Sequence, residues 1–240
     1  MQIDVVFNEF CNWLATRTGA MTEDNIRYYW FVAMLKQDNN LNNYTLEASY
    51  SNLAKKELDL LYSPSIGENW AMEMKFHRKT QSTFAHTDAA GAIFNDLFRL
   101  TSYKSNGDLR RLFLYVTDSE MDGYLKNGSS TDLFRKLLKE FYTMSVNDSQ
   151  KISLGGITAP DTFVQSAKAS SNAITSNVRL LQKWDFYEMN SLSFHGRECH
   201  VRLYEVHEQM LNISKENCTK EESSHPPSRP NIFDSWYEGF

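Results

Sequence analysis

The chain has 240 residues, of which 41% are hydrophobic and 13% aromatic, so it contains enough apolar material for one large globular core. A formal net charge of −5 argues against a protein that coats nucleic acid nonspecifically, although it leaves room for a local basic groove. We expect neither a signal peptide nor a membrane span, because no stretch approaches the ~20 apolar residues that a span needs. The sparse cysteines, Cys11, Cys199 and Cys218, lack metal-ligand spacing and are typical of reduced thiols in the cytoplasm.

Two helices and a strand are predicted at the start of the chain. Residues 3–16 carry apolar side chains at spacings of three and four, and residues 26–36 form a dense aromatic and aliphatic run behind a helix start at 22–25. Residues 42–51 alternate apolar and polar side chains with the period of two that indicates a strand. Glu47 lies on its polar side, where an ordinary solvated glutamate is the alternative to a role in a site.

A β-hairpin is predicted next, from the apolar-rich runs at 57–62 and 70–76 and the Pro, Gly and Asn of the segment between them. The apolar face of the first strand is expected to comprise Leu58, Leu60 and Tyr62. Asp59 lies on the opposite face, and Glu73 and Lys75 share one face of the second strand. Antiparallel pairing therefore brings these three charged residues within reach of one another.

Such a charged trio on an otherwise apolar hairpin is unfavourable unless a cation or a catalytic task accounts for it. The alternative is a surface ion pair, whose stabilisation would be at most about 1 kcal/mol.

Beyond the hairpin, residues 87–100 have the cap and the apolar stripe of a helix, and residues 110–118 form a near-continuous apolar run typical of a buried strand. Because a helix precedes it, this strand should lie parallel to a neighbour through a crossover. Asp96 and Arg99 stand three positions apart in the helix and are expected to pair with each other. Asp118, at the end of the strand, is expected to form a turn.

The C-terminal part is predicted to add to this core. The expected elements are an amphipathic helix at 131–144, a short strand at 150–157, a helix at 160–173 and two strands at 177–185 and 198–206. Residues 215–230 have the polar, proline-rich composition of a linker, and residues 231–240 are aromatic again. The expected organisation is a core at 1–145, an addition for substrate recognition or dimerisation at 146–214, and a flexible linker with an aromatic tail at 215–240.

Asp59 and the Glu73-Met74-Lys75 element, on adjacent strands between helices, resemble the active-site motif of the PD-(D/E)XK nuclease superfamily. The resemblance implies an α/β, restriction-endonuclease-like fold with a mixed central sheet flanked by helices in the order α-β-β-β-α-β, here followed by a C-terminal β-containing addition. Leu58 stands where the family name has proline.

The resemblance also implies roles for individual residues. Asp59, Glu73 and the main-chain carbonyl of Met74 would hold Mg²⁺, with Mn²⁺ as the alternative, and Lys75 would position or activate the attacking water. The first core helix of the family often supplies a further glutamate, for which Glu23 is the candidate here. Alternatively, Glu23 only complements the dipole of its helix.

His77, Arg78 and Lys79 follow the motif, and such a cluster could hold the phosphates of the cleaved strand. A solvated strand end is the alternative. The implied function is a metal-dependent endonuclease of restriction or defence type that acts on double-stranded DNA, as a homodimer if it cuts both strands of a specific sequence. A non-cleaving nucleic-acid-binding or assembly module on the same fold is the alternative.

Overall fold

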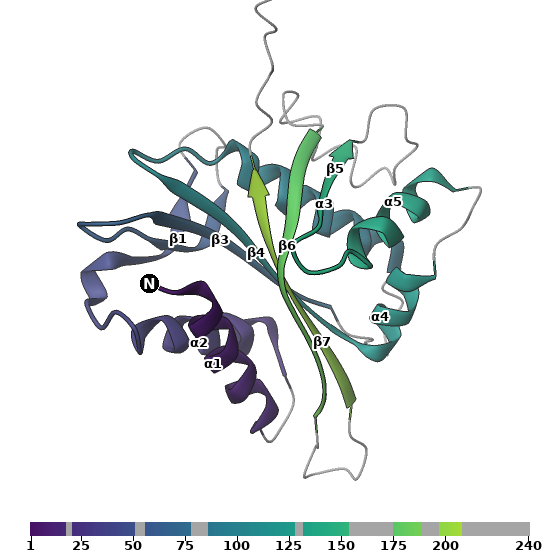
Figure 1. Ribbon diagram of the computed structural model, residues 1–240, viewed down its shortest axis with the longest axis horizontal. Coiled ribbons are helices and arrows are strands. Elements are labelled where there is room, and N and C mark those ends of the chain that lie inside the picture. Colours follow the sequence, from purple (N-terminus) through teal and green to yellow (C-terminus); the bar gives the residue numbers. More distant parts are fainter. Residues whose placement is uncertain are drawn as a thin grey trace, which may run out of the picture. The chain divides into compact units, whose positions relative to one another are not determined.

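The computed structural model describes residues 1–17, 21–50, 56–77, 86–127, 132–153, 175–188 and 197–207, and these belong to one compact unit, Met1–Gln209. They form a seven-stranded mixed sheet with helices on both faces (Figure 1). The strands are β1 (Tyr44–Ser49), β2 (Glu57–Tyr62), β3 (Asn69–His77), β4 (Leu109–Asp118), β5 (Ser149–Ser153), β6 (Thr175–Glu188) and β7 (Arg197–His207). Their order across the sheet is β1-β2-β3-β4-β7-β6-β5, and the β3–β4 pair is parallel whereas the other neighbours are antiparallel.

The helices lie in two layers, one on each face of the sheet (Figure 1). One face is covered by α1 (Ile3–Ala15) and α2 (Glu23–Leu35), which pack their apolar sides on β3, β4 and β7. The other face is covered by α3 (His86–Ser102), α4 (Ser119–Lys126) and α5 (Leu133–Tyr142). A short 3-10 helix, Leu41–Asn43, precedes β1. No helix in the described ranges is long and apolar enough to cross a membrane.

The central strand β4 explains the near-continuous apolar run in its sequence. Residues 112–116 are all fully buried, because helices cover both faces of the sheet at this point. The helix α3 connects β3 to β4, and the two strands are parallel, as predicted for a crossover connection. The chain therefore runs α2-β1-β2-β3-α3-β4 through the part of the fold that contains the charged trio.

A capping box fixes where α2 begins. The Thr22 hydroxyl accepts a hydrogen bond from the Asn25 N–H at 3.2 Å, and the Asn25 side chain accepts one from the Thr22 N–H at 3.0 Å. The helix consequently begins at Glu23, which projects from the first turn. This local signal matters for function because Glu23 is one of the predicted site residues.

The predicted alternation of β1 and β2 is wrong at one point, where both strands change faces. Leu58 packs in the core under α3, whereas Leu60 and Tyr62 pack in the core under α1 and α2. Leu46 pairs with Leu60 and Ala48 with Leu58, and Glu47, which stands between them, has a φ of 52°. A non-glycine residue in this left-handed conformation interrupts the period of two, so the side chains on either side of it exchange faces.

The positive φ at Glu47 should make glycine acceptable there, although glycine normally weakens a strand. We expect Glu47→Gly to leave the free energy of unfolding unchanged or to raise it by up to about 1 kcal/mol. Thr45→Gly, at an exposed position of the same strand, should instead lower it by about 0.5–1 kcal/mol. Urea denaturation of both variants measures the difference, and equal losses would argue against strain at Glu47.

Two further expectations are corrected or extended. Asp118 does not end β4 in a simple turn; it caps α4, and its side chain accepts a hydrogen bond from the Met121 N–H at 3.0 Å. The strands predicted at 177–185 and 198–206 are present as β6 and β7, and they extend the same sheet, with β7 directly beside β4. The helix predicted at 160–173 and the segment 215–240 lie outside the described residues.

Candidate functional site

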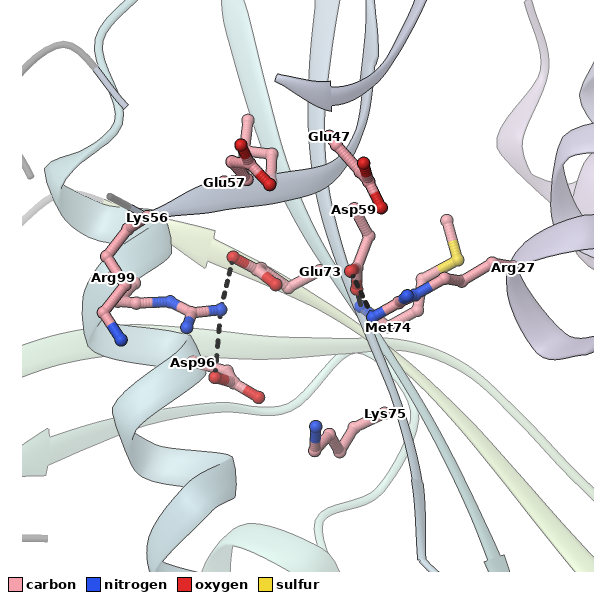
Figure 2. Close-up of a pocket in the computed structure, with 11 residues that line it drawn as sticks. Arg27, Glu47, Lys56, Glu57, Asp59, Glu73, Met74, Lys75, Asp96 and Arg99 are labelled. Carbon is pink, nitrogen blue, oxygen red and sulfur yellow. Dashed lines mark hydrogen bonds and ion pairs between the residues drawn. The ribbon is translucent and has the colours of Figure 1, made fainter. Parts of the chain in front are cut away.

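A pocket of about 270 Å³ opens where β2 and β3 stop pairing. The ladder between these strands covers Tyr62–Trp70, Leu61–Ala71 and Leu60–Met72 and goes no further. Beyond it the strands diverge between α2 and α3, and charged side chains fill the gap (Figure 2). The pocket is lined by Arg27, Glu47, Lys56, Glu57, Leu58, Asp59, Glu73, Met74, Lys75, Asp96 and Arg99.

Asp59 lies at the point of divergence and takes over a backbone interaction that the strand pair no longer makes. Its Oδ2 accepts a hydrogen bond from the Met74 N–H at 2.6 Å, and its Oδ1 lies 2.7 Å from Nη2 of Arg27 (Figure 2). The side chain is only 10% exposed. Burial raises the pKa of Asp59, while the Arg27 guanidinium and the Met74 N–H oppose that rise.

Glu73 is the most deeply buried carboxylate of the predicted trio, with 4% of its side chain exposed. Its Oε1 accepts a hydrogen bond from the Tyr50 hydroxyl at 2.8 Å and lies 2.7 Å from Nη2 of Arg99. Burial, together with the neighbouring Asp96 carboxylate, raises the pKa of Glu73 to about 8, although Arg99 opposes the shift. Among the described residues no hydrogen bond or ion pair engages its second oxygen, Oε2.

Lys75 forms an ion pair with Glu23. Glu23 is also the first residue of α2, so the structure is compatible both with a role in the site and with a role in complementing the helix dipole. The Lys75 ammonium lies 3.3 Å from Oε2 of Glu23, and the same oxygen accepts a hydrogen bond from the Phe76 N–H at 3.5 Å. Glu23 Oε1 additionally lies 3.1 Å from Arg27. Glu23 thus links the first turn of α2 to the end of the motif strand.

Several residues that line this pocket were not assigned to it from the sequence, among them Arg27, Asp96 and Arg99. Asp96 and Arg99 do pair, at 3.1 Å, as their spacing predicted, but both also face the motif carboxylate Glu73 (Figure 2). Arg27 comes from α2, where it also forms an ordinary helical ion pair with Glu23, four positions earlier. Burial raises the pKa of Asp96 to about 6, and the nearby cations Arg99 and Lys75 oppose the rise.

Of the three predicted phosphate contacts, His77, Arg78 and Lys79, the structure describes only His77. His77 is 8% exposed, and its Nδ1 lies 3.0 Å from the Tyr115 hydroxyl. Burial, with a smaller effect of Lys75, lowers the pKa of His77 to about 3, so the ring is neutral near pH 7. A neutral, buried ring offers no charge to a phosphate, and a contact between His77 and nucleic acid stays a prediction. Arg78 and Lys79 lie outside the described residues.

The carboxylate oxygens of the pocket suit a hard cation, but Asp59 and Glu73 each also contact an arginine. Within the described parts of the chain, no group of three or more His, Cys, Asp or Glu side chains is arranged to hold a metal ion. Mg²⁺, however, is commonly bound by one or two carboxylates and several waters. Asp59 and Glu73 provide two carboxylates, and Arg27 and Arg99 each neutralise one of them in this structure.

No protein-family model matches the chain, and neither does a curated protein or a solved structure. The function is therefore argued from the geometry of the pocket.

Proposed function

We propose that this protein is a Mg²⁺-dependent endonuclease with a restriction-endonuclease-like fold, which hydrolyses phosphodiester bonds of double-stranded DNA. The observation that carries the proposal is the convergence of Asp59, Glu73 and Lys75 on one pocket where two strands diverge. The element order α2-β1-β2-β3-α3-β4 supports it, because this is the order that the resemblance to PD-(D/E)XK nucleases implies. A role in restriction or defence, in the cytoplasm, follows from that resemblance alone.

The chemistry would be divided among the residues that line the pocket. Asp59, Glu73 and the carbonyl of Met74 would hold the ion, which when bound polarises the phosphate and lowers the pKa of a bound water. Lys75 would orient the attacking water and stabilise negative charge on the phosphate. Glu23 would position Lys75, because its carboxylate contacts the ammonium directly.

A second candidate is a nucleic-acid-binding or assembly module on the same fold that does not cleave. The observation that favours it is the pairing of both proposed metal-binding carboxylates with arginines, Asp59 with Arg27 and Glu73 with Arg99. Guanidinium groups that neutralise both carboxylates could make a cation unnecessary for the stability of the pocket.

Cleavage assays on supercoiled plasmid and on single-stranded DNA, each with Mg²⁺, Mn²⁺ or a chelator, distinguish the two candidates. We expect cleavage that requires a divalent cation and that falls by about a hundredfold or more in Asp59→Asn, because a lost metal ligand removes the electrostatic stabilisation of the transition state. Asp38→Asn is the matched control, since Asp38 is a hydrogen-bonded carboxylate outside the pocket. Binding without cleavage under every condition would favour the non-cleaving module, and cleavage that survives Asp59→Asn would contradict the proposed site.

A further inference from the structure

The proposed metal site leaves the role of Arg99 unexplained. This residue projects from α3, and its Nη2 bridges Oε1 of Glu73 at 2.7 Å and Oδ1 of Asp96 at 3.1 Å (Figure 2). A guanidinium on a metal ligand competes with the metal, because both neutralise the same carboxylate. If Arg99 served only to hold Glu73 in place, it would therefore weaken the metal binding that the proposed function requires.

The guanidinium of Arg99 has more donor capacity than its present partners use. Arginine carries five N–H donors in a rigid fork, and the contacts found for Arg99 among the described residues all use Nη2. Its Nε is buried without a hydrogen-bond partner in that part of the chain. The fork matches the geometry of a phosphate, which can accept two parallel hydrogen bonds.

Asp96 keeps this fork at the wall of the pocket whatever happens to Glu73. It lies three residues before Arg99 on the same helix, and its side chain is 8% exposed. If a divalent cation binds Glu73, the carboxylate shares its charge with the ion, the Glu73–Arg99 attraction weakens, and the cation repels the guanidinium. Arg99, which lines the pocket, would then remain on Asp96 with donor capacity that Glu73 no longer uses.

We propose that Arg99 is a substrate-binding residue that neutralises Glu73 in the cation-free protein and binds a phosphate of the nucleic acid once a divalent cation engages Glu73. The inference rests on the proposed function and adds a consequence to it: the cation and the nucleic acid bind interdependently, because each removes a penalty for the other.

The affinity for a short fluorescent DNA duplex tests this inference, measured by anisotropy at alkaline pH, where Glu73 is ionised, at several salt concentrations with Ca²⁺ or with a chelator. In Ca²⁺, Arg99→Gln should weaken binding about tenfold and reduce the slope of log affinity against log salt by about one, as expected for one lost phosphate contact. With chelator the variant and the wild type should bind alike, because Glu73 occupies the guanidinium. The matched control is Arg110→Gln, which removes a guanidinium from the buried carboxylate of Glu205, 2.6 Å away and outside the pocket.

Binding of Mn²⁺ without DNA, followed by electron paramagnetic resonance at alkaline pH, distinguishes a substrate-binding role of Arg99 from a purely structural one. Arg99→Gln should bind Mn²⁺ at least as tightly as the wild type, because a competing cation has been removed. If the variant instead loses Mn²⁺ and DNA affinity together, Arg99 only holds Glu73 in place and the inference is overturned.

Equal DNA affinities and salt slopes for Arg99→Gln and Arg110→Gln would also overturn it. Should Arg99→Gln fail to fold, Arg99→Lys keeps the charge but loses the fork, and it should weaken duplex binding in Ca²⁺ to a smaller degree. A wild-type protein that binds no Mn²⁺ would refute the proposed function itself, whereas metal-dependent cleavage with an unaffected Arg99→Gln would refute this inference alone.

Discussion

Replacing Lys75 with alanine is expected to lower the rate of DNA cleavage by about a hundredfold to a thousandfold, the range measured when one preorganised donor to a developing charge is lost. The pocket contains other cations, but they have different partners. Arg27 and Arg99 contact the proposed metal ligands Asp59 and Glu73, whereas Lys75 contacts Glu23. Because Lys75 follows Glu73 on β3 and is paired with neither proposed metal-binding carboxylate, we assign it to the attacking water.

The Lys75→Ala variant should still bind a DNA duplex in Ca²⁺ with less than about a threefold change in affinity, since the Lys75 ammonium is already paired with Glu23 and is assigned to the water rather than to a phosphate. Lys36→Ala is the matched control, because Lys36 also pairs with a glutamate, Glu9, and neither residue lines the pocket. Single-turnover cleavage with saturating enzyme separates chemistry from binding. A variant that cleaves at the wild-type rate would show that Lys75 does not take part in the reaction.

The sheet order around the motif could be predicted because local patterns there agree with the tertiary fold. The apolar run in β4 indicated a buried strand, and the helix before it indicated a parallel neighbour, which the structure identifies as β3. The Thr22 cap likewise indicated the start of α2. Each of these signals depends on neighbouring residues, or on a rule of chain connection that holds for nearly all proteins.

The exchange of faces at Glu47 could not be predicted, because no sequence signal required a left-handed conformation at a glutamate. The end of the β2–β3 ladder at Leu60 and Met72, where the pocket opens, likewise has no local sequence signal. Arg27 and Arg99 were missed for a related reason. Each forms a helical ion pair with a residue three or four positions away, which concealed the contacts that they make across the fold.

The buried carboxylates should also leave a signature in the pH dependence of stability. The pKa of Glu73 rises to about 8 in the folded protein from an ordinary value of 4.5, so the folded state binds its proton more tightly than the unfolded state. The stability that this proton contributes is fully present below about pH 4.5 and is lost as the pH rises through about 8. Without divalent cations, the free energy of unfolding should therefore fall between these pH values.

Glu73→Gln removes the titrating group, so the fall in the free energy of unfolding that Glu73 causes should disappear. A smaller pH dependence of the free energy of unfolding should remain below about pH 6, because the pKa of Asp96 is raised to about 6. Between pH 5 and pH 8, the wild type should lose at least about 1 kcal/mol relative to the variant, since one proton is worth up to about 1.4 kcal/mol per pH unit. Urea denaturation in chelator at each pH measures this difference, with Glu205→Gln as a control for the loss of a buried carboxylate–arginine pair. If the wild type and Glu73→Gln instead have parallel profiles, Arg99 stabilises the Glu73 carboxylate enough to offset its burial, and the arginine is bound too firmly for a cation to displace it.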